Sequence, residues 1–262
     1  MSSDSKNNQG PAGKKSKRGK KRRGKGGSSG KRNYIRGRNK NEKVKSARGR
    51  KGSSTRWLKR QLNDPYVQEA KERGYRSRAV FKLMEIDDKY RFLKPGAVVV
   101  DLGMAPGSWA ELAVERIKPK ETDGRVVGVD LLETEALDGV DFLKGDFTDP
   151  ETVTWLNNQL KGRKVDAVLS DMAANTTGHQ TTDHLKIIAL AESAWQFAAQ
   201  VLAPGGIFLT KLFQGGAEAD LLVPLKQNFK TVKHLKPQAS RNDSSEVYLF
   251  AQGYKERVKE DD

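Results

Sequence analysis

The sequence predicts an α/β fold: a doubly wound, mostly parallel, seven-stranded sheet that ends in an antiparallel hairpin. Two observations lead to this prediction. From residue 75 onward, short apolar runs typical of buried strands alternate with segments that have helical spacing of apolar residues. The last two strand-like segments, near 231–235 and 246–253, have no helix of comparable length between them, which favours an antiparallel pair at the sheet edge.

Each predicted element has its own signal. Apolar residues at helical spacing within 78–86 predict a helix that ends before Lys94-Pro95-Gly96. The apolar run 97–103 ends in glycine, as is typical of a strand buried on both faces. The next strands are predicted at 125–131, 140–146, 165–172 and 207–213. The helices between the strands are predicted at 106–117, 150–160, 184–202 and 218–229.

Residues 1–60 differ from the rest of the chain in charge. They contain 23 Lys and Arg and two acidic residues, whereas residues 61–262 contain 26 and 31. With few apolar residues, this segment cannot bury enough surface to offset its chain entropy, so we expect a disordered basic tail. Its charge favours RNA binding through counterion release, and a solubilising tail is the alternative. The predicted domain then covers 61–255, and 256–262 form a charged end.

The composition excludes several kinds of chemistry. The 262-residue chain has no cysteine, which rules out disulfides, thiolate metal sites and cysteine nucleophiles. No metal site is predicted. No apolar run has the length of a membrane span or a signal-peptide core, so we expect a cytoplasmic protein with no membrane partner.

The segment 101–109 joins the first strand to the next helix and reads D-L-G-M-A-P-G-S-W. Glycines there let backbone amides approach a ligand at a helix N-terminus. The G-x-G-x-x-G spacing of dinucleotide enzymes is missing, which favours a ligand other than NAD. Asp130 and Asp146 end the second and third strands, where a carboxylate can accept from ribose hydroxyls or an adenine amino group. Capping of the next turn or helix is the structural alternative for each.

Four charged residues fall at the same predicted edge of the sheet. They are Lys82, Asp171, Lys211 and Glu246. Charges among apolar strand residues need partners, because an unpaired buried charge costs several kcal/mol. A structural salt-bridge network is one explanation. Two lysines and two acids beside a ligand site also suit a reaction in which a base removes a proton from a weakly acidic hydroxyl.

Together these motifs resemble the FtsJ family of ribosomal RNA large-subunit 2′-O-ribose methyltransferases. The resemblance covers about residues 77–253 and implies the Rossmann-like fold of class I methyltransferases. It rests on the 101–109 motif, S-R-A-x-F-K-L at 77–83, S-D-M-A-x-N at 170–175, K-x-F-Q-G at 211–215, Ser240-Arg241 and Glu246-Val247-Tyr248. Two positions depart from the family pattern: Ser108 replaces a glycine and Ala174 replaces a proline.

The resemblance also implies roles for individual residues. Lys211 is expected to accept the proton, Asp171 to orient and tune it, and Lys82 and Glu246 to position the ribose. The cofactor is expected to be S-adenosylmethionine. Its implied contacts are Gly107, Trp109, Asp130, Asp146 and Asp171. The implied substrate is a uridine in the A loop of 23S rRNA, met on the assembled 50S subunit, and we expect the protein to act as a monomer.

Three other functions fit the sequence less well. A base methyltransferase acting at pyrimidine carbon 5 needs a cysteine, and one acting on an exocyclic amine is expected to carry an Asn/Asp-Pro-Pro-aromatic loop where this chain has Asp171-Met172-Ala173-Ala174. A dehydrogenase is disfavoured by the loop chemistry. A non-catalytic ribosome-assembly factor that binds rRNA through its tail has no need of the four charged residues.

Overall fold

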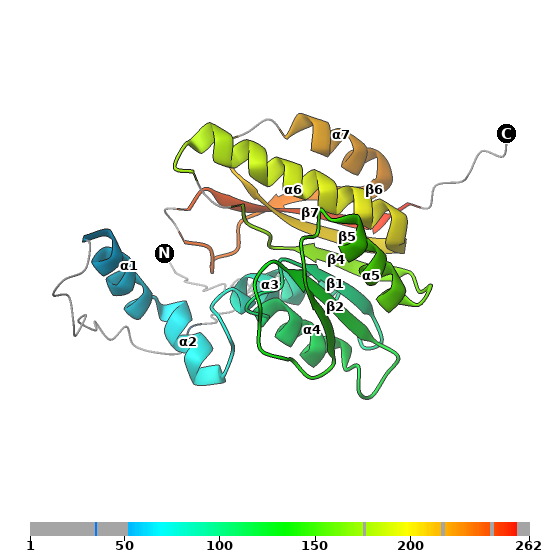
Figure 1. Ribbon diagram of the computed structural model, residues 1–262, viewed down its shortest axis with the longest axis horizontal. Helices are drawn as coiled ribbons and strands as arrows, with labels where there is room; N and C mark the ends of the chain where they lie inside the picture. Colours follow the sequence, from blue (N-terminus) through cyan, green and yellow to red (C-terminus); the bar gives the residue numbers. More distant parts are fainter. Residues whose placement is uncertain (1–34, 36–51, 175–176, 216–217, 242–243, 256–262) are drawn as a thin grey trace, which may run out of the picture. The chain divides into compact units, whose positions relative to one another are not determined.

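The computed structural model describes Ile35 and residues 52–174, 177–215, 218–241 and 244–255 (Figure 1). The chain divides into the units 1–33 and 34–262, and every described residue belongs to the second. The remaining residues of the predicted tail before 52, Asn175 of the 170–175 motif and the predicted C-terminal end 256–262 lie outside the described residues. Among the described residues, no helix combines the length and apolar character needed to cross a membrane.

The described sheet has seven strands in the order β3-β2-β1-β4-β5-β7-β6. Strands β1 to β5 are parallel, and β7 lies antiparallel between β5 and β6. The predicted doubly wound sheet with its antiparallel hairpin is therefore confirmed. The strands are β1 Val98–Leu102, β2 Arg125–Asp130, β3 Val140–Lys144, β4 Val165–Ser170, β5 Leu202–Phe213, β6 Phe229–Leu235 and β7 Glu246–Tyr254.

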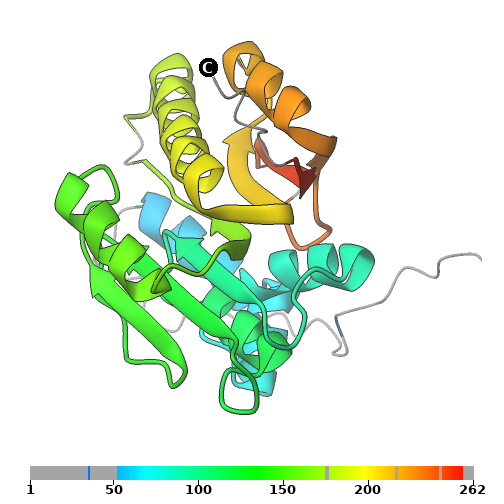
Figure 2. The same ribbon diagram turned by 90° about the vertical axis from the view of Figure 1, so that its right-hand side faces the viewer.

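Helices cover both faces of the sheet (Figure 2). One face packs against α2 Pro65–Arg73, α3 Val80–Tyr90 and α4 Ser108–Ile117. The other packs against α5 Pro150–Leu160, α6 Gln180–Val201 and α7 Ala219–Asn228. Strand β1 shows why both faces need cover: Val98 and Val100 join the α5–α7 core, while Val99 between them joins the α2–α4 core.

The predicted elements differ from the observed ones mainly at their ends. Helix α6 begins at Gln180, before the predicted start at 184, because the carboxylate of Asp183 accepts the backbone amides of Thr177 and Gly178 at 2.6 and 3.2 Å. Strand β5 begins at Leu202, before the predicted start at 207, since its pairing with β4 continues past a register shift between Val165 and Ala167.

Two helices before α3 were not predicted. Helix α1 spans Gly52–Leu62, so the prediction of disorder up to residue 60 is wrong for 52–60. A tertiary contact holds the end of this helix: Arg241 donates from Nη2 to Gln61 Oε1 at 2.9 Å. Helix α2 follows at once, capped by Asp64, whose carboxylate accepts from Tyr66 N at 3.0 Å.

Candidate active site

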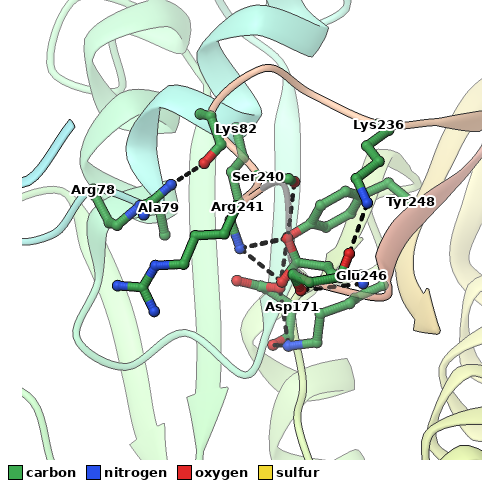
Figure 3. Close-up of polar contacts among 12 residues, drawn as sticks. Arg78, Ala79, Lys82, Asp171, Lys236, Ser240, Arg241, Glu246 and Tyr248 are labelled. Carbon is green, nitrogen blue, oxygen red and sulfur yellow. Dashed lines mark hydrogen bonds and ion pairs between the residues drawn. The ribbon is translucent and has the colours of Figure 1, made fainter. Parts of the chain in front are cut away.

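The fold brings the four predicted charged residues to one place, as Figure 3 shows for Lys82, Asp171 and Glu246. Lys211 lies opposite Tyr248 in the β5–β7 register, two residues after Leu209, which joins the α2–α4 core. Because strand side chains alternate, Lys211 and Tyr248 face the same side as α3, which carries Lys82. Asp171 follows β4 directly, at the carboxyl end of the parallel strands.

A continuous chain of polar contacts links these side chains. Lys82 Nζ donates to Glu246 Oε2 at 2.8 Å and to the hydroxyl of Tyr248 at 3.1 Å. Tyr248 in turn donates to Asp171 Oδ1 at 2.9 Å. Lys211 Nζ lies 3.0 Å from the same Asp171 oxygen and donates to the Asp171 backbone carbonyl at 2.6 Å. Each lysine is thus paired with one acid, and Tyr248 joins the two pairs.

The electrostatics of the cluster fix two protonation states. Burial raises the pKa of Asp171, but the charges of Lys211 and Lys82 and the hydrogen bonds from Lys211 and Tyr248 outweigh it, so the pKa lies below its usual range. Burial and the charges of Asp171 and Glu246 hold the pKa of Tyr248 well above its usual value. At neutral pH, Asp171 is therefore a carboxylate and Tyr248 a neutral hydroxyl.

The glycine-rich loop, residues 103–107, follows β1 and lies beside Asp130 and Met172. Gly107, with φ of +98°, is the N-cap of α4, so the first amides of that helix point out of its N-terminus. A Cβ on Gly103 would lie 2.8 Å from the backbone of Met172. Asp130 accepts the backbone amides of Ala105 and Leu132 at 2.8 Å each, one on each carboxylate oxygen. Each oxygen keeps a second lone pair with which it can accept a hydroxyl.

Two other predicted cofactor residues have structural roles as well. The indole of Trp109 is buried and donates to the carbonyl of Ala79 at 2.9 Å, so only its backbone amide can face a ligand at the α4 N-terminus. Asp146 is exposed, and its Oδ1 accepts from the amide and hydroxyl of Thr148 at 2.8 and 2.7 Å. These bonds match the turn-capping alternative and involve only one of its two oxygens.

Comparison with known proteins identifies the family of this chain. The family model described as FtsJ-like methyltransferase matches residues 75–254. The chain belongs to this family. Proteins named Ribosomal RNA large subunit methyltransferase E from Parvibaculum lavamentivorans and Azorhizobium caulinodans are both 57% identical to it, the first over 82% of this chain and 87% of the relative, the second over 81% and 88%. A crystal structure of a protein assigned as a ribosomal RNA methyltransferase from Plasmodium falciparum matches with a TM-score of 0.62 and 31% identity, covering 70% of this chain and all of that one.

A pocket of about 180 Å³ opens beside Lys82 and Glu246 in this FtsJ-like methyltransferase. Arg78 and Arg241 also line it, and both pair with the carboxylate of Asp64. One carboxylate between two guanidinium groups leaves a net positive charge here. The sequence motifs include both arginines, but their shared partner precedes the motifs and was not predicted.

Two further residues at this site were not predicted as functional. Tyr248 was noted only as part of a motif, and its bridging position depends on the β5–β7 register. Asp101 is only 1% exposed, and neither carboxylate oxygen has a hydrogen bond among the described residues. Burial, together with the negative charges of Asp171 and Asp130, raises the pKa of Asp101 to about 8. The nearby backbone amide of Ala110 offsets only part of this rise. A charged residue inside the apolar run of β1 was the available signal.

Proposed function

We propose that this methyltransferase transfers the methyl group of S-adenosylmethionine to the ribose 2′-hydroxyl of a uridine in 23S rRNA on the 50S subunit. The paired Lys82–Glu246 and Lys211–Asp171, joined through Tyr248, are the observation that carries this proposal. The names of the relatives support the large ribosomal subunit as the source of the substrate. We further propose that the protein acts in the cytoplasm as a monomer.

The residues present fit the proposed cofactor. Gly107 caps α4 in the left-handed region, which leaves the first amides of that helix directed out of its N-terminus, and Gly103 lets the loop approach the backbone of Met172 closely. Asp130 can accept the ribose hydroxyls, the exposed Asp146 the adenine amino group, and Asp171 supplies a negative charge on the side of the reacting group. S-adenosylmethionine, when bound, supplies a methyl group on a positively charged sulfur, which suits a site that includes the carboxylates of Asp130 and Asp171.

The contacts support a catalytic role for each residue of this cluster. In its neutral amine form, Lys211 Nζ accepts the proton of the 2′-hydroxyl and becomes an ammonium, and Asp171 holds that nitrogen in place through its side chain and its backbone carbonyl. Lys82 and Glu246 line the neighbouring pocket and position the ribose there. Arg78 and Arg241, on the same pocket, offer positive charge to the phosphates of the RNA strand.

Ribose-methylation mapping of 23S rRNA tests the substrate assignment. In cells that lack this gene, we expect one uridine of the A loop to lose its 2′-O-methyl group and to regain it when the gene is restored. An rRNA whose ribose methylation is unchanged by the loss would contradict the proposal. Loss of a base methylation instead would assign the protein to another methyltransferase class.

The cofactor assignment predicts the effect of Asp130→Ala. We expect S-adenosylmethionine binding to weaken by about 1.5–3 kcal/mol, the range for hydrogen bonds to a charged group, and we expect no NAD binding by either protein. Calorimetry measures both. Asp138→Ala is the matched control, because Asp138 lies in the same loop after β2 with its side chain 77% exposed. Tight NAD binding, or an Asp130→Ala affinity equal to that of the control, argues against the assignment.

The charge of the N-terminal segment predicts a salt-dependent role in RNA binding. The deletion should end at residue 51, because α1 begins at Gly52 and its last turn contacts Arg241. We expect the shortened protein to bind 50S subunits more weakly and with a flatter dependence on salt, while its S-adenosylmethionine affinity stays the same. If binding to 50S subunits keeps its salt slope after the deletion, the segment serves solubility and does not bind RNA.

A further inference from the structure

Arg76, in the connection between α2 and α3, holds two separate loops together. Its Nη1 lies within hydrogen-bond distance of the carbonyl of Pro106 at 3.1 Å, the hydroxyl of Thr134 at 3.2 Å and the carbonyl of Glu135 at 2.7 Å. Its Nη2 donates to the carbonyl of Ala136 at 2.9 Å. The guanidinium therefore joins the glycine-rich loop before α4 to the loop after β2.

The surroundings leave Arg76 little freedom. Its Nε lies 3.5 Å from Glu111 Oε1, its backbone amide donates to Glu111 Oε2 at 3.0 Å, and the side chain is only 18% exposed. The hydroxyl of Thr134 also donates to the carbonyl of Pro106 at 2.9 Å, which ties the same two loops directly. A Cβ on Gly107 would lie 3.0 Å from Arg76 Nη1, so any other residue there would push the guanidinium away by a few tenths of an ångström.

These contacts indicate what Arg76 does and what it does not do. Carbonyl oxygens that accept from a guanidinium form charge-assisted bonds, and the planar fork of arginine reaches several acceptors that a lysine cannot reach together. Most of its donors are already directed at the protein. Arg78, two residues later, lines the substrate pocket instead. The two arginines of this short segment thus serve different sites.

We infer that Arg76 is a positioning residue that fixes the loop after β2 against the glycine-rich loop and thereby sets the affinity for the cofactor, not for RNA. This inference rests on the proposed function, because both loops flank the proposed S-adenosylmethionine site. Gly107 belongs to one loop, and Asp130 immediately precedes the other. We call the contacts of the Arg76 guanidinium with the two loops the clamp. Without the clamp, both loops stay folded but are no longer held at a fixed separation, so the cofactor has to order them when it binds.

Arg76→Lys tests the inference, because it keeps the charge and removes the fork. We expect the KM for S-adenosylmethionine to rise by about 10- to 100-fold, while kcat at saturating cofactor and the KM for undermodified 50S subunits stay close to parental values. Arg116→Lys is the matched control, since Arg116 pairs with Asp87 and Asp88 at the other end of α4. It should leave all three constants unchanged.

Calorimetry with S-adenosylmethionine and S-adenosylhomocysteine gives a second readout that is independent of methyl transfer. A positioning role predicts that Arg76→Lys and Arg76→Ala weaken both ligands by the same factor. If Arg76→Ala strengthens S-adenosylmethionine relative to S-adenosylhomocysteine, Arg76 acts through its charge and the inference is wrong. A raised KM for 50S subunits with unchanged cofactor affinity would make Arg76 an RNA contact and overturns it too.

The same binding data separate this inference from the proposed function. A parent protein that binds S-adenosylmethionine but methylates no rRNA contradicts the proposed function, while the loss of affinity in Arg76→Lys still supports the clamp. A parent protein that binds no S-adenosylmethionine overturns both. Should Arg76→Ala fail to fold, Arg76→Lys and Thr134→Val, which removes the second tie between the loops, carry the test; unchanged cofactor affinity in both variants contradicts it.

Discussion

Lys211→Arg is expected to slow methyl transfer by about 10²- to 10⁴-fold, the range for loss of a general base. Arginine keeps the positive charge beside Asp171 but does not give up its proton in any useful pH range. The variant can therefore keep its ion pair and its affinity for S-adenosylmethionine and RNA, yet it has no neutral nitrogen to receive the 2′ proton. Single-turnover methylation of undermodified 50S subunits at saturating enzyme measures the chemical step directly.

The control for this prediction is Lys233→Arg, which makes the same replacement on the exposed side of β6. It should transfer methyl groups at the parental rate. If Lys211→Arg also stays near that rate, Lys211 acts only as an electrostatic partner of Asp171 and the proposed base is wrong. If Lys211→Arg instead loses cofactor binding, the buried site cannot hold the larger side chain, and Lys211→Met, which is uncharged and of similar length, then has to show the same loss of rate.

The second large effect is expected for Asp101→Asn and concerns stability. The pKa of Asp101 is raised to about 8 in the folded protein, whereas an aspartate in an unfolded chain titrates near pH 4. Between these values the folded state keeps a proton that the unfolded state releases, so the contribution of Asp101 to the free energy of unfolding falls as the pH rises. The decrease is on the order of 5 kcal/mol by pH 9, and asparagine, which has no such proton, abolishes it.

Urea unfolding of the parent and Asp101→Asn between pH 5 and pH 9 checks this prediction. The difference in unfolding free energy between the two proteins should shift steadily in favour of Asp101→Asn as the pH rises towards 8. Taking the difference removes the contributions of other titrating groups, and Asp138→Asn on the surface should show no such trend. A difference that does not change with pH would mean that Asp101 is ionised in the folded protein at neutral pH.

The sequence predicted the sheet because β1 to β5 carry local signals. The apolar runs of β1 and β4 are buried on both faces, and glycine directly follows β1 and β3, so the local pattern predicts these strands. Helices α1 and α2 lack such a signal. They are largely polar, and Arg241, which is distant in sequence, contacts both Gln61 and Asp64. A contact over such a separation cannot be read from a local pattern.

Three of the four charged residues of the site were predictable for a topological reason. Parallel strands end at one edge of a sheet and an antiparallel strand begins there, so Asp171, Lys211 and Glu246 had to converge. The bridging role of Tyr248 and the clamp of Arg76 were not predictable, because each depends on side-chain distances across separate elements. The hydrogen bond that Asp130 accepts from the amide of Ala105 in the glycine-rich loop was not predictable for the same reason.

Transfer of the methyl group to a ribose oxygen can be measured with a labelled cofactor. Purified protein is incubated with S-adenosylmethionine carrying a labelled methyl group and with 50S subunits from cells that lack the gene, and the rRNA is then digested to nucleosides. We expect one label per subunit, recovered as 2′-O-methyluridine, and none with Lys211→Arg on the same timescale. Label in a base-methylated nucleoside, or no label with folded protein that binds S-adenosylmethionine, would contradict ribose methylation by this protein.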